Sequence, residues 1–193
     1  MIQPLGDALS AYDRELPLLK TLEERYGDWL RQLCEGAARR LNAELGGRAE
    51  FEATDEDGIW GFGFELSGKL ARAGLDVRLW SAAFYGGSPG IIRIGAYLPR
   101  QLPRGLPTAE EIRPAVEAVY AQAGYSAPGA GEYDVHDCGD DHVNIGWRDV
   151  SIAAPDVFAQ VLGVMREAVT ATETASKVVV AAVPSGPAAK RRR

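Results

Sequence analysis

The residues whose types and spacing could support chemistry lie close together, at positions 134–144. This segment holds both histidines of the chain and one of its two cysteines. If residues 138–140 form a three-residue turn, the flanking strands pair so that His136 faces His142. The two imidazoles would then lie about 5 Å apart at Cβ, with Asp134 and Asn144 on the same face and Val143, Ile145 and Trp147 on the other. The sequence therefore predicts a hairpin with one polar face that carries every histidine of the chain.

This hairpin has two interpretations. Asp134, His136, His142 and Asn144 offer carboxylate, imidazole and amide ligands that suit zinc or another divalent ion. A bound ion would lower the pKa of a water molecule and generate hydroxide for hydrolysis. The simpler interpretation is a solvated polar face, because no second cluster of His or Cys can complete a closed coordination shell. A metal-dependent hydrolase is therefore the alternative function, with zinc or a similar ion as its cofactor.

Other sequence features do not predict a catalytic site. Cys138 lies beside both histidines, but the aspartates around it favour the neutral thiol. Residues 86–90 match the Gly-X-Ser-X-Gly nucleophile elbow, yet a strand pattern follows where a helix is required. The acidic run at 55–58 lacks the oxygen ligands that continue a calcium loop. The sequence has no phosphate-binding or dinucleotide-binding glycine motif, so we assign no catalytic residues.

Composition indicates an ordinary globular chain. Its 193 residues, 46% of them hydrophobic, can bury the core of one domain. Cys34 and Cys138 lie too far apart in the sequence for a disulfide framework or a tetrathiolate zinc site, which favours a reducing compartment. No apolar run approaches the roughly 20 residues that a membrane-spanning helix needs. We therefore expect a cytoplasmic protein without a membrane partner.

Charge is distributed unevenly along the chain. The formal net charge is −6, although residues 177–193 contain basic residues and no acidic ones. The remaining, strongly acidic part should repel a phosphate backbone, so nucleic acid is not expected as its partner. Only the basic end could make such a contact, through Lys190, Arg191, Arg192 and Arg193.

Hydrophobic periodicity predicts an α+β fold. An apolar stripe indicates a long helix over residues 16–45, with Pro17 near its start and Gly46-Gly47 as its stop, and a short helix over 7–14 could precede it. A period of two then indicates strands, and capping signals indicate two later helices. The predicted elements are strands around Phe51 and at 59–66, 75–85 and 91–98, a helix from Thr108 to Ala123, a hairpin at 132–147 and a helix from Pro155.

These elements predict an antiparallel, meandering sheet of about five to six strands packed against long N-terminal and C-terminal helices, with a further helix between strands four and five. We expect residues 1–174 to form a single domain. Residues 175–193 are predicted to be a flexible tail, rich in Ala, Val and Pro, with a basic end. Within that tail, the run at 178–183 could add an edge strand to a partner.

The face of the sheet without helices is the expected contact surface. Alternation places Trp80 and Phe84 on the same face as Arg78 and Arg93, and such an aromatic group favours a protein partner or a second layer. The lack of catalytic motifs favours a non-catalytic protein-interaction module. We expect a small adaptor, chaperone-like or immunity-type protein that binds a protein partner or forms a homodimer, through the helix at 16–45 or through this face.

Overall fold

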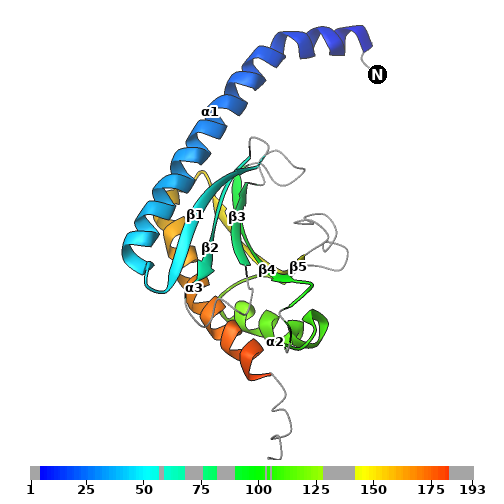
Figure 1. The fold of residues 1–193 in the computed structure, drawn as a ribbon. Helices are drawn as coiled ribbons and strands as arrows, with labels where there is room; N and C mark the ends of the chain where they lie inside the picture. The colour runs from blue at the N-terminus through cyan, green and yellow to red at the C-terminus, as the bar shows by residue number, and fades with distance from the viewer. Residues whose placement is uncertain are drawn as a thin grey trace, which may run out of the picture.

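In the computed structural model the described residues are 5–56, 59–67, 76–81, 90–102, 104, 106–127 and 142–182. The α+β class and the antiparallel pairing of strands are confirmed. The elements run in the order shown in Figure 1: α1 (Leu5–Leu45), β1 (Ala49–Glu56), β2 (Ile59–Leu66), β3 (Asp76–Ser81), β4 (Ile91–Pro99), α2 (Ala109–Gln122), β5 (His142–Ser151) and α3 (Val157–Ala181).

Within the described residues, five strands form one antiparallel sheet in the order β1-β2-β3-β4-β5. Each strand pairs with the next along the chain, so the sheet is a meander, and α2 interrupts it between β4 and β5. Alternation along β4 separates two faces, since Ile92, Ile94 and Leu98 are fully buried while Arg93 between them is only partly buried. The buried side chains on the first of these faces belong to the hydrophobic core.

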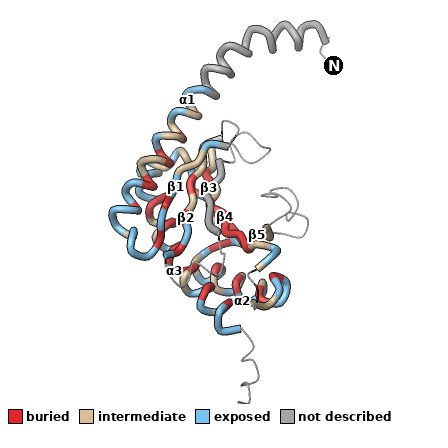
Figure 2. The backbone as a smooth tube through the Cα atoms, in the orientation of Figure 1, coloured by how far each residue is buried: buried red, intermediate tan, exposed pale blue. Residues whose placement is uncertain are grey.

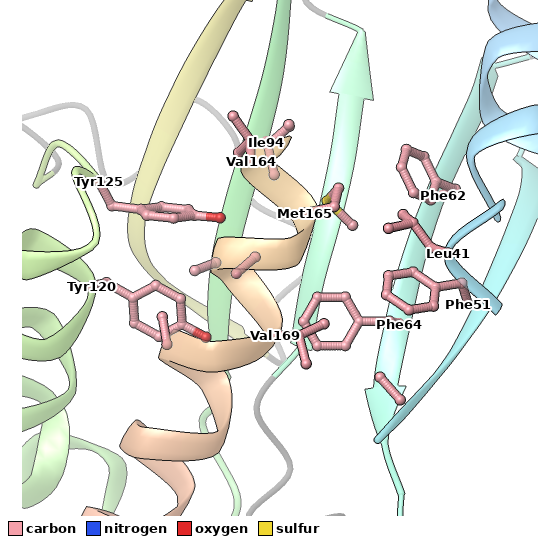
Figure 3. Packing of buried hydrophobic residues seen from close by; sticks show 14 of the residues in the cluster. Leu41, Phe51, Phe62, Phe64, Ile94, Tyr120, Tyr125, Val164, Met165 and Val169 are labelled. Atoms are coloured by element: carbon pink, nitrogen blue, oxygen red, sulfur yellow. The ribbon is translucent and has the colours of Figure 1, made fainter. Parts of the chain in front are cut away.

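Helices cover one face of the sheet. Helix α1 packs on β1 and β2, and α3 contacts α1, α2 and the sheet. Figure 2 shows buried positions concentrated where these elements meet. In Figure 3, α3 carries Met165 and Val169 toward the phenylalanines of β1 and β2, while Tyr120 and Tyr125 lie on its other side. The core is therefore one continuous cluster that α3 crosses.

The local sequence explains where α2 begins. The side chain of Thr108 accepts from the Glu111 amide, and the Glu111 carboxylate accepts from the Thr108 amide at 2.8 Å, which completes a capping box. Pro114 therefore lies in the interior of the helix and not in its first turn. The helix ends at Gln122, one residue before the predicted Ala123, and Gly124 follows with a φ of +80° that favours glycine.

Helix α1 differs from the prediction at its start. It runs without interruption from Leu5, so the predicted short helix and long helix are one element, and Pro17 lies in its interior. A proline there costs one backbone hydrogen bond but does not end a helix of 41 residues. The predicted stop after Leu45 is confirmed, and close packing requires glycine at position 46, since a Cβ there would lie 2.6 Å from the Asn42 carbonyl oxygen.

The predicted start of the tail at residue 175 is wrong. Helix α3 continues to Ala181, and Ala175, Ser176 and Val179 are buried in the core. Valines 178–180 are therefore helical and do not form an edge strand. Small residues continued the helical stripe there, and they give a weak hydrophobic signal in the sequence. Residues 183–193, including the basic end, lie outside the described residues.

The strand predicted around Phe51 is longer than expected, because β1 runs from Ala49 to Glu56. Thr54, Asp55 and Glu56 belong to β1, where Thr54 pairs with Gly61 and Glu56 with Ile59.

No helix in the described part of the chain combines the length and apolar character needed to cross a membrane.

A side chain occupies the outer edge of β1. The Asn42 side chain donates to the carbonyl of Phe51 at 2.7 Å and accepts from the Phe51 amide at 2.8 Å. It therefore supplies both hydrogen bonds that a neighbouring strand would make at this point. Unpaired edges of sheets invite strand addition from other chains, so Asn42 both ties α1 to β1 and protects the edge.

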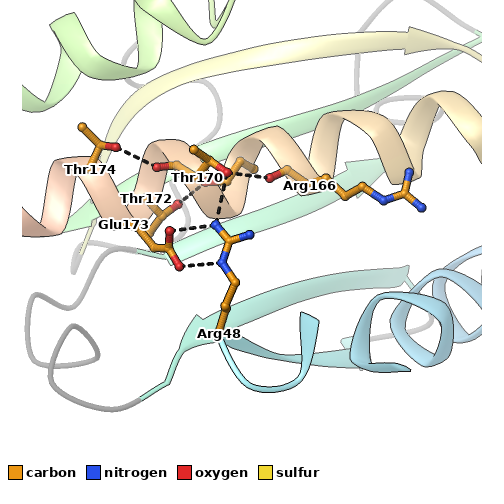
Figure 4. A network of polar contacts seen from close by, with 7 residues as sticks. Arg48, Arg166, Thr170, Thr172, Glu173 and Thr174 are labelled. Atoms are coloured by element: carbon orange, nitrogen blue, oxygen red, sulfur yellow. Dashed lines mark hydrogen bonds and ion pairs between the residues drawn. The ribbon is translucent and has the colours of Figure 1, made fainter. Parts of the chain in front are cut away.

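Polar contacts on the surface tie the first half of the chain to its last helix (Figure 4). Arg48 binds both carboxylate oxygens of Glu173, at 2.8 and 2.7 Å, and donates to the Thr170 hydroxyl at 3.2 Å. Arg166 binds Glu44 at 2.7 Å. The hydrogen bond from Arg48 lowers the pKa of Glu173 below its ordinary value. The two-point geometry makes Arg48 to Glu173 the better defined of these ion pairs.

We predict that Asn42→Ala lowers the free energy of unfolding by about 1–2 kcal/mol, because two hydrogen bonds to the Phe51 backbone are lost. Urea denaturation followed by circular dichroism measures the change. Gln32→Ala, at an exposed position of the same helix, is the matched control and should change stability by less than about 0.5 kcal/mol. Equal stability of Asn42→Ala and wild type would contradict the role of Asn42.

We predict that Glu173→Gln costs about 0.5–1 kcal/mol at pH 7, a small value because solvent screens this partly exposed pair. The folded-state pKa of Glu173 is lowered, so its stabilisation is complete above the unfolded value of about 4.3 and is lost as pH falls through the folded value. Denaturant titrations at several pH values should show wild type and variant converging in acid. Glu24→Gln on the exposed surface of α1 is the control, and a difference that is constant with pH would refute the assignment.

Candidate functional site

The sheet face opposite the helices carries a group of polar and aromatic side chains from β4 and β5. Strand register places Arg93 opposite Asp149, Gly95 opposite Trp147 and Tyr97 opposite Asn144 on this face. We call the group Arg93, Tyr97, Asn144, Trp147 and Asp149 the open-face cluster. Tyr97, Asn144 and Trp147 are nevertheless at most 9% exposed, so this part of the face is well covered.

The charged part of the open-face cluster is internally paired. The Arg93 guanidinium donates to both carboxylate oxygens of Asp149, at 2.9 and 3.0 Å. It also lies over the ring of Trp147, with its Cζ atom 4.4 Å from the ring centroid. This combination of bidentate pairing and cation–π stacking fixes the guanidinium plane. Arg93 therefore presents a rigid, charge-balanced surface.

A glycine makes room for the tyrosine of this cluster. A Cβ on Gly95 would clash with the hydroxyl oxygen of Tyr97, so the Tyr97 ring extends along β4 over Gly95. Any larger residue at position 95 would displace the Tyr97 side chain. Two contacts therefore shape this face: the Arg93 guanidinium lies over the Trp147 ring, and the Tyr97 side chain lies over Gly95.

The structure brings together three of the four predicted contact residues at the level of the backbone. Trp80 pairs with Arg93, and Arg78 pairs with Gly95, so β3 and β4 place these positions side by side. The side chains of Arg78 and Trp80 lie outside what the structure describes. Phe84 lies outside the described residues altogether. Strand alternation had not indicated Asp149 as the partner of Arg93, although Trp147 and Asp149 are two residues apart in one strand.

The predicted arrangement of faces in β5 is wrong for Trp147. The prediction placed Val143, Ile145 and Trp147 on one face, but the β4–β5 register shifts between Ala96 and Tyr97. Ile145 is the extra residue of this β-bulge, so the alternation reverses after it. Trp147 consequently lies on the open face together with Asn144. Its backbone partner on the outer edge is Ser126, which is not part of the predicted hairpin.

Two of the four predicted metal ligands lie in the described residues. His142 opposes Pro99 and Asn144 opposes Tyr97, which places both on the open face as predicted. Asp134 and His136 lie outside the described residues, as does Cys138. Within the residues that the structure describes, no group of three or more His, Cys, Asp or Glu side chains could hold a metal ion.

The described pocket lies elsewhere. A groove of about 780 Å³ separates the C-terminal end of α2 from α3. Arg148 crosses it to reach the Ala123 carbonyl at 3.1 Å and also pairs with Glu167, while Arg166 pairs with Glu44. Arg148 thus satisfies a carbonyl that the end of α2 leaves unpaired. Both arginines of the groove have structural partners, so the groove is a joint between helices.

Cys34 is not suited to nucleophilic chemistry. Its side chain is fully buried in α1, and burial together with the charge of Glu35 raises the pKa of the thiol to about 12. The thiolate, which is the nucleophile, is therefore scarce at neutral pH. Cys34 contributes to the core as a small apolar side chain.

We predict that native Cys34 reacts with a thiol reagent at least about a hundredfold more slowly than in the unfolded chain, because its pKa is raised and its sulfur is buried. A Cys138→Ser variant leaves Cys34 as the single thiol, and its labelling with dithionitrobenzoate reports the rate. The same variant in denaturing urea supplies the reference rate. Equal rates in both conditions would show that Cys34 is accessible.

Comparison with known proteins adds no family assignment. No protein-family model, no curated protein sequence and no solved structure matches this chain. Functional inference therefore depends on the geometry of the chain itself, above all on α1 and on the open face of the sheet.

Proposed function

We propose that this chain is a non-catalytic protein-interaction module, of the small adaptor, chaperone-like or immunity type, that self-associates through the N-terminal half of α1. The observation that carries this proposal is the length of α1 relative to the sheet. Its 41 residues correspond to about 60 Å. Figure 1 shows the N-terminal half of this helix extending past the sheet.

Only the C-terminal part of α1 is seen to contribute buried side chains to the core. Among the α1 residues whose burial is described, 24–45, the first buried position is Leu30, and the others are Leu33, Cys34, Ala37, Ala38 and Leu41. An isolated helix of this kind is marginally stable in water. A helix that extends well past its own core therefore favours a binding partner that supports it.

The sequence pattern continues past the end of the core. Leu33, Leu30 and Tyr26 are spaced three and four residues apart. The same spacing continues toward the N-terminus, first at Glu23 and then at a row of apolar residues. Residues at this spacing fall on one face of a helix, as in a coiled-coil seam. The row consists of Leu19, Leu16, Tyr12, Leu9 and Leu5.

A second copy of the chain is the partner that this pattern favours. Two identical apolar rows complement each other around a twofold axis. In a parallel pairing, Glu15 and Lys20 occupy flanking positions five residues apart, where opposite charges form salt bridges between helices. The row and its flanking charges therefore support a homodimer.

Two further expectations belong to this proposal. Arg78, Trp80 and Arg93 form the proposed second contact surface, for a protein ligand of the assembled dimer, and Phe84 is proposed as its neighbour. The proposed location is the cytoplasm, a compartment in which a thiol such as the buried Cys34 stays reduced. Hydrolysis at the residues 134–144 is not proposed, because no described side chains assemble a catalytic group there.

We predict that the full chain behaves as a dimer in size-exclusion chromatography with light scattering, with twice the 20.8 kDa mass of one chain. Leu19→Glu should give a monomer at the same concentration, because it places a charge in the apolar row. Thr21→Glu adds the same charge on the opposite side of the helix and should leave the dimer intact.

Circular dichroism checks that each variant keeps its helix content. A wild-type chain that remains a monomer at all accessible concentrations would overturn the proposal. A dimer that both glutamate variants preserve would place the interface elsewhere and would equally overturn the role of α1.

A further inference from the structure

The part of the open face formed by β1 and β2 carries negative charges that no cation balances. Most carboxylates in the described part of the chain take part in an ion pair or a hydrogen bond. The exceptions there are all exposed, and they are Glu24, Glu50, Glu52, Glu65 and Glu110. Glu24 lies on α1 and Glu110 on α2, whereas the remaining three share one face of the β1–β2 hairpin. We call Glu50, Glu52 and Glu65 the acidic face.

Strand register brings the charges of the acidic face close together. Glu50 lies directly opposite Glu65, and Glu52 lies opposite Gly63. Like charges at directly opposite positions destabilise a sheet, so this arrangement favours binding of a cationic group. The backbone register of β3 places Asp76 next in the row of Glu65, which adds a further acidic position.

The floor between these carboxylates is formed by backbone. Gly61 and Gly63 are the residues of β2 that precede Glu65 on this face, and neither has a side chain that would cover the strand. Glycines within a strand often mark a place where another backbone approaches closely. Arg78, opposite Gly63, is the single basic residue in the sequences of β1, β2 and β3, so it cannot balance the acidic positions around it.

The chain itself carries the complementary charge within reach. Residues 190–193 are all basic and follow α3, which ends at Ala181. Glu173 of α3 binds Arg48, the residue directly before β1, and the helix continues for only about 12 Å past Glu173. An extended segment of residues 183–193 spans up to about 36–40 Å. This length is sufficient to pass around the sheet to its open face.

We propose that the basic residues 190–193 bind in cis to the acidic face. Guanidinium groups donate to the carboxylates of Glu50, Glu52 and Glu65, and the backbone of the tail lies over the glycines. The contact does not require dimerisation through α1. Because β3 adjoins this hairpin, the bound tail also limits access to the contact surface around Arg78. This last consequence, unlike the tail contact itself, rests on the proposed function.

The test attaches a nitroxide spin label next to the basic residues of the full chain. Ala189→Cys in a Cys138→Ser background supplies the labelling site, because the remaining thiol of Cys34 is fully buried. In ¹⁵N-labelled protein at about 20 mM NaCl, the amide signals of Gly61 and Gly63 should lose about half or more of the intensity that they have with the reduced label. About 0.5 M NaCl should restore them, since salt screens the attraction.

Two double variants of the labelled chain identify the carboxylates that hold the tail. Glu50→Gln with Glu65→Gln should restore the signals. The matched control is Glu24→Gln with Glu110→Gln, which removes the same charge elsewhere and should leave the broadening intact. Unchanged positions of the other amide signals verify that each variant is folded.

The proposal is overturned if the chain with an intact acidic face shows no broadening, or if broadening persists at high salt. It is equally overturned if the first double variant keeps the broadening, or if both double variants abolish it. A mixture of ¹⁵N chains without the label and spin-labelled ¹⁴N chains tests whether the contact is intramolecular. Broadening as strong in this mixture as in the doubly labelled chain would show a contact between chains and would also overturn the proposal.

Discussion

Burial of one face of the sheet under α1 and α3 is the constraint on which the remaining structure depends. Ile92, Ile94 and Leu98 of β4 have no exposed surface, and α3 packs between the aromatic residues of β2 and two tyrosines, Tyr120 of α2 and Tyr125 just after it. Each large side chain of this cluster contributes about 1.5–3 kcal/mol when it is buried. Because these residues must all face the helices, every alternate residue is directed to the other face, which determines where polar groups gather.

The β-bulge at Ile145 changes the outcome of that alternation. Without it, and with Asn144 still opposite Tyr97, Trp147 would lie opposite Ile94 and join the core. With it, Val143 remains with the core residues while Trp147 reaches Arg93, and the cation–π contact becomes possible. Bulges commonly re-aim side chains near functional sites. One extra residue in β5 thus creates the aromatic and polar character of the open face.

The sequence predicts what depends on local patterns. Phe62 and Phe64 alternate with glycines and specify β2, and Thr108 with Glu111 specifies the start of α2. The same alternation correctly grouped His142 with Asn144. The bulge could not be predicted, because an unpaired residue leaves no trace in the sequence of one strand. The Arg93–Asp149 pair joins residues 56 positions apart, and such pairing depends on register between strands. The length of α3 was missed because Ala175 and Ser176 are small, yet smallness is what allows their helix to pack closely.

Helix α3 is the last element of the described chain, yet its side chains complete the core formed by elements that are synthesised much earlier. Arg48 and Glu173 are separated by 125 residues, and Phe62 and Phe64 find their cover on the same late helix. On the ribosome, synthesis proceeds at about 5–20 residues per second, so the part of the apolar sheet face that α1 does not cover remains open until the final helix emerges. The nascent chain therefore passes through a period of several seconds in which part of its apolar, aggregation-prone surface is unshielded.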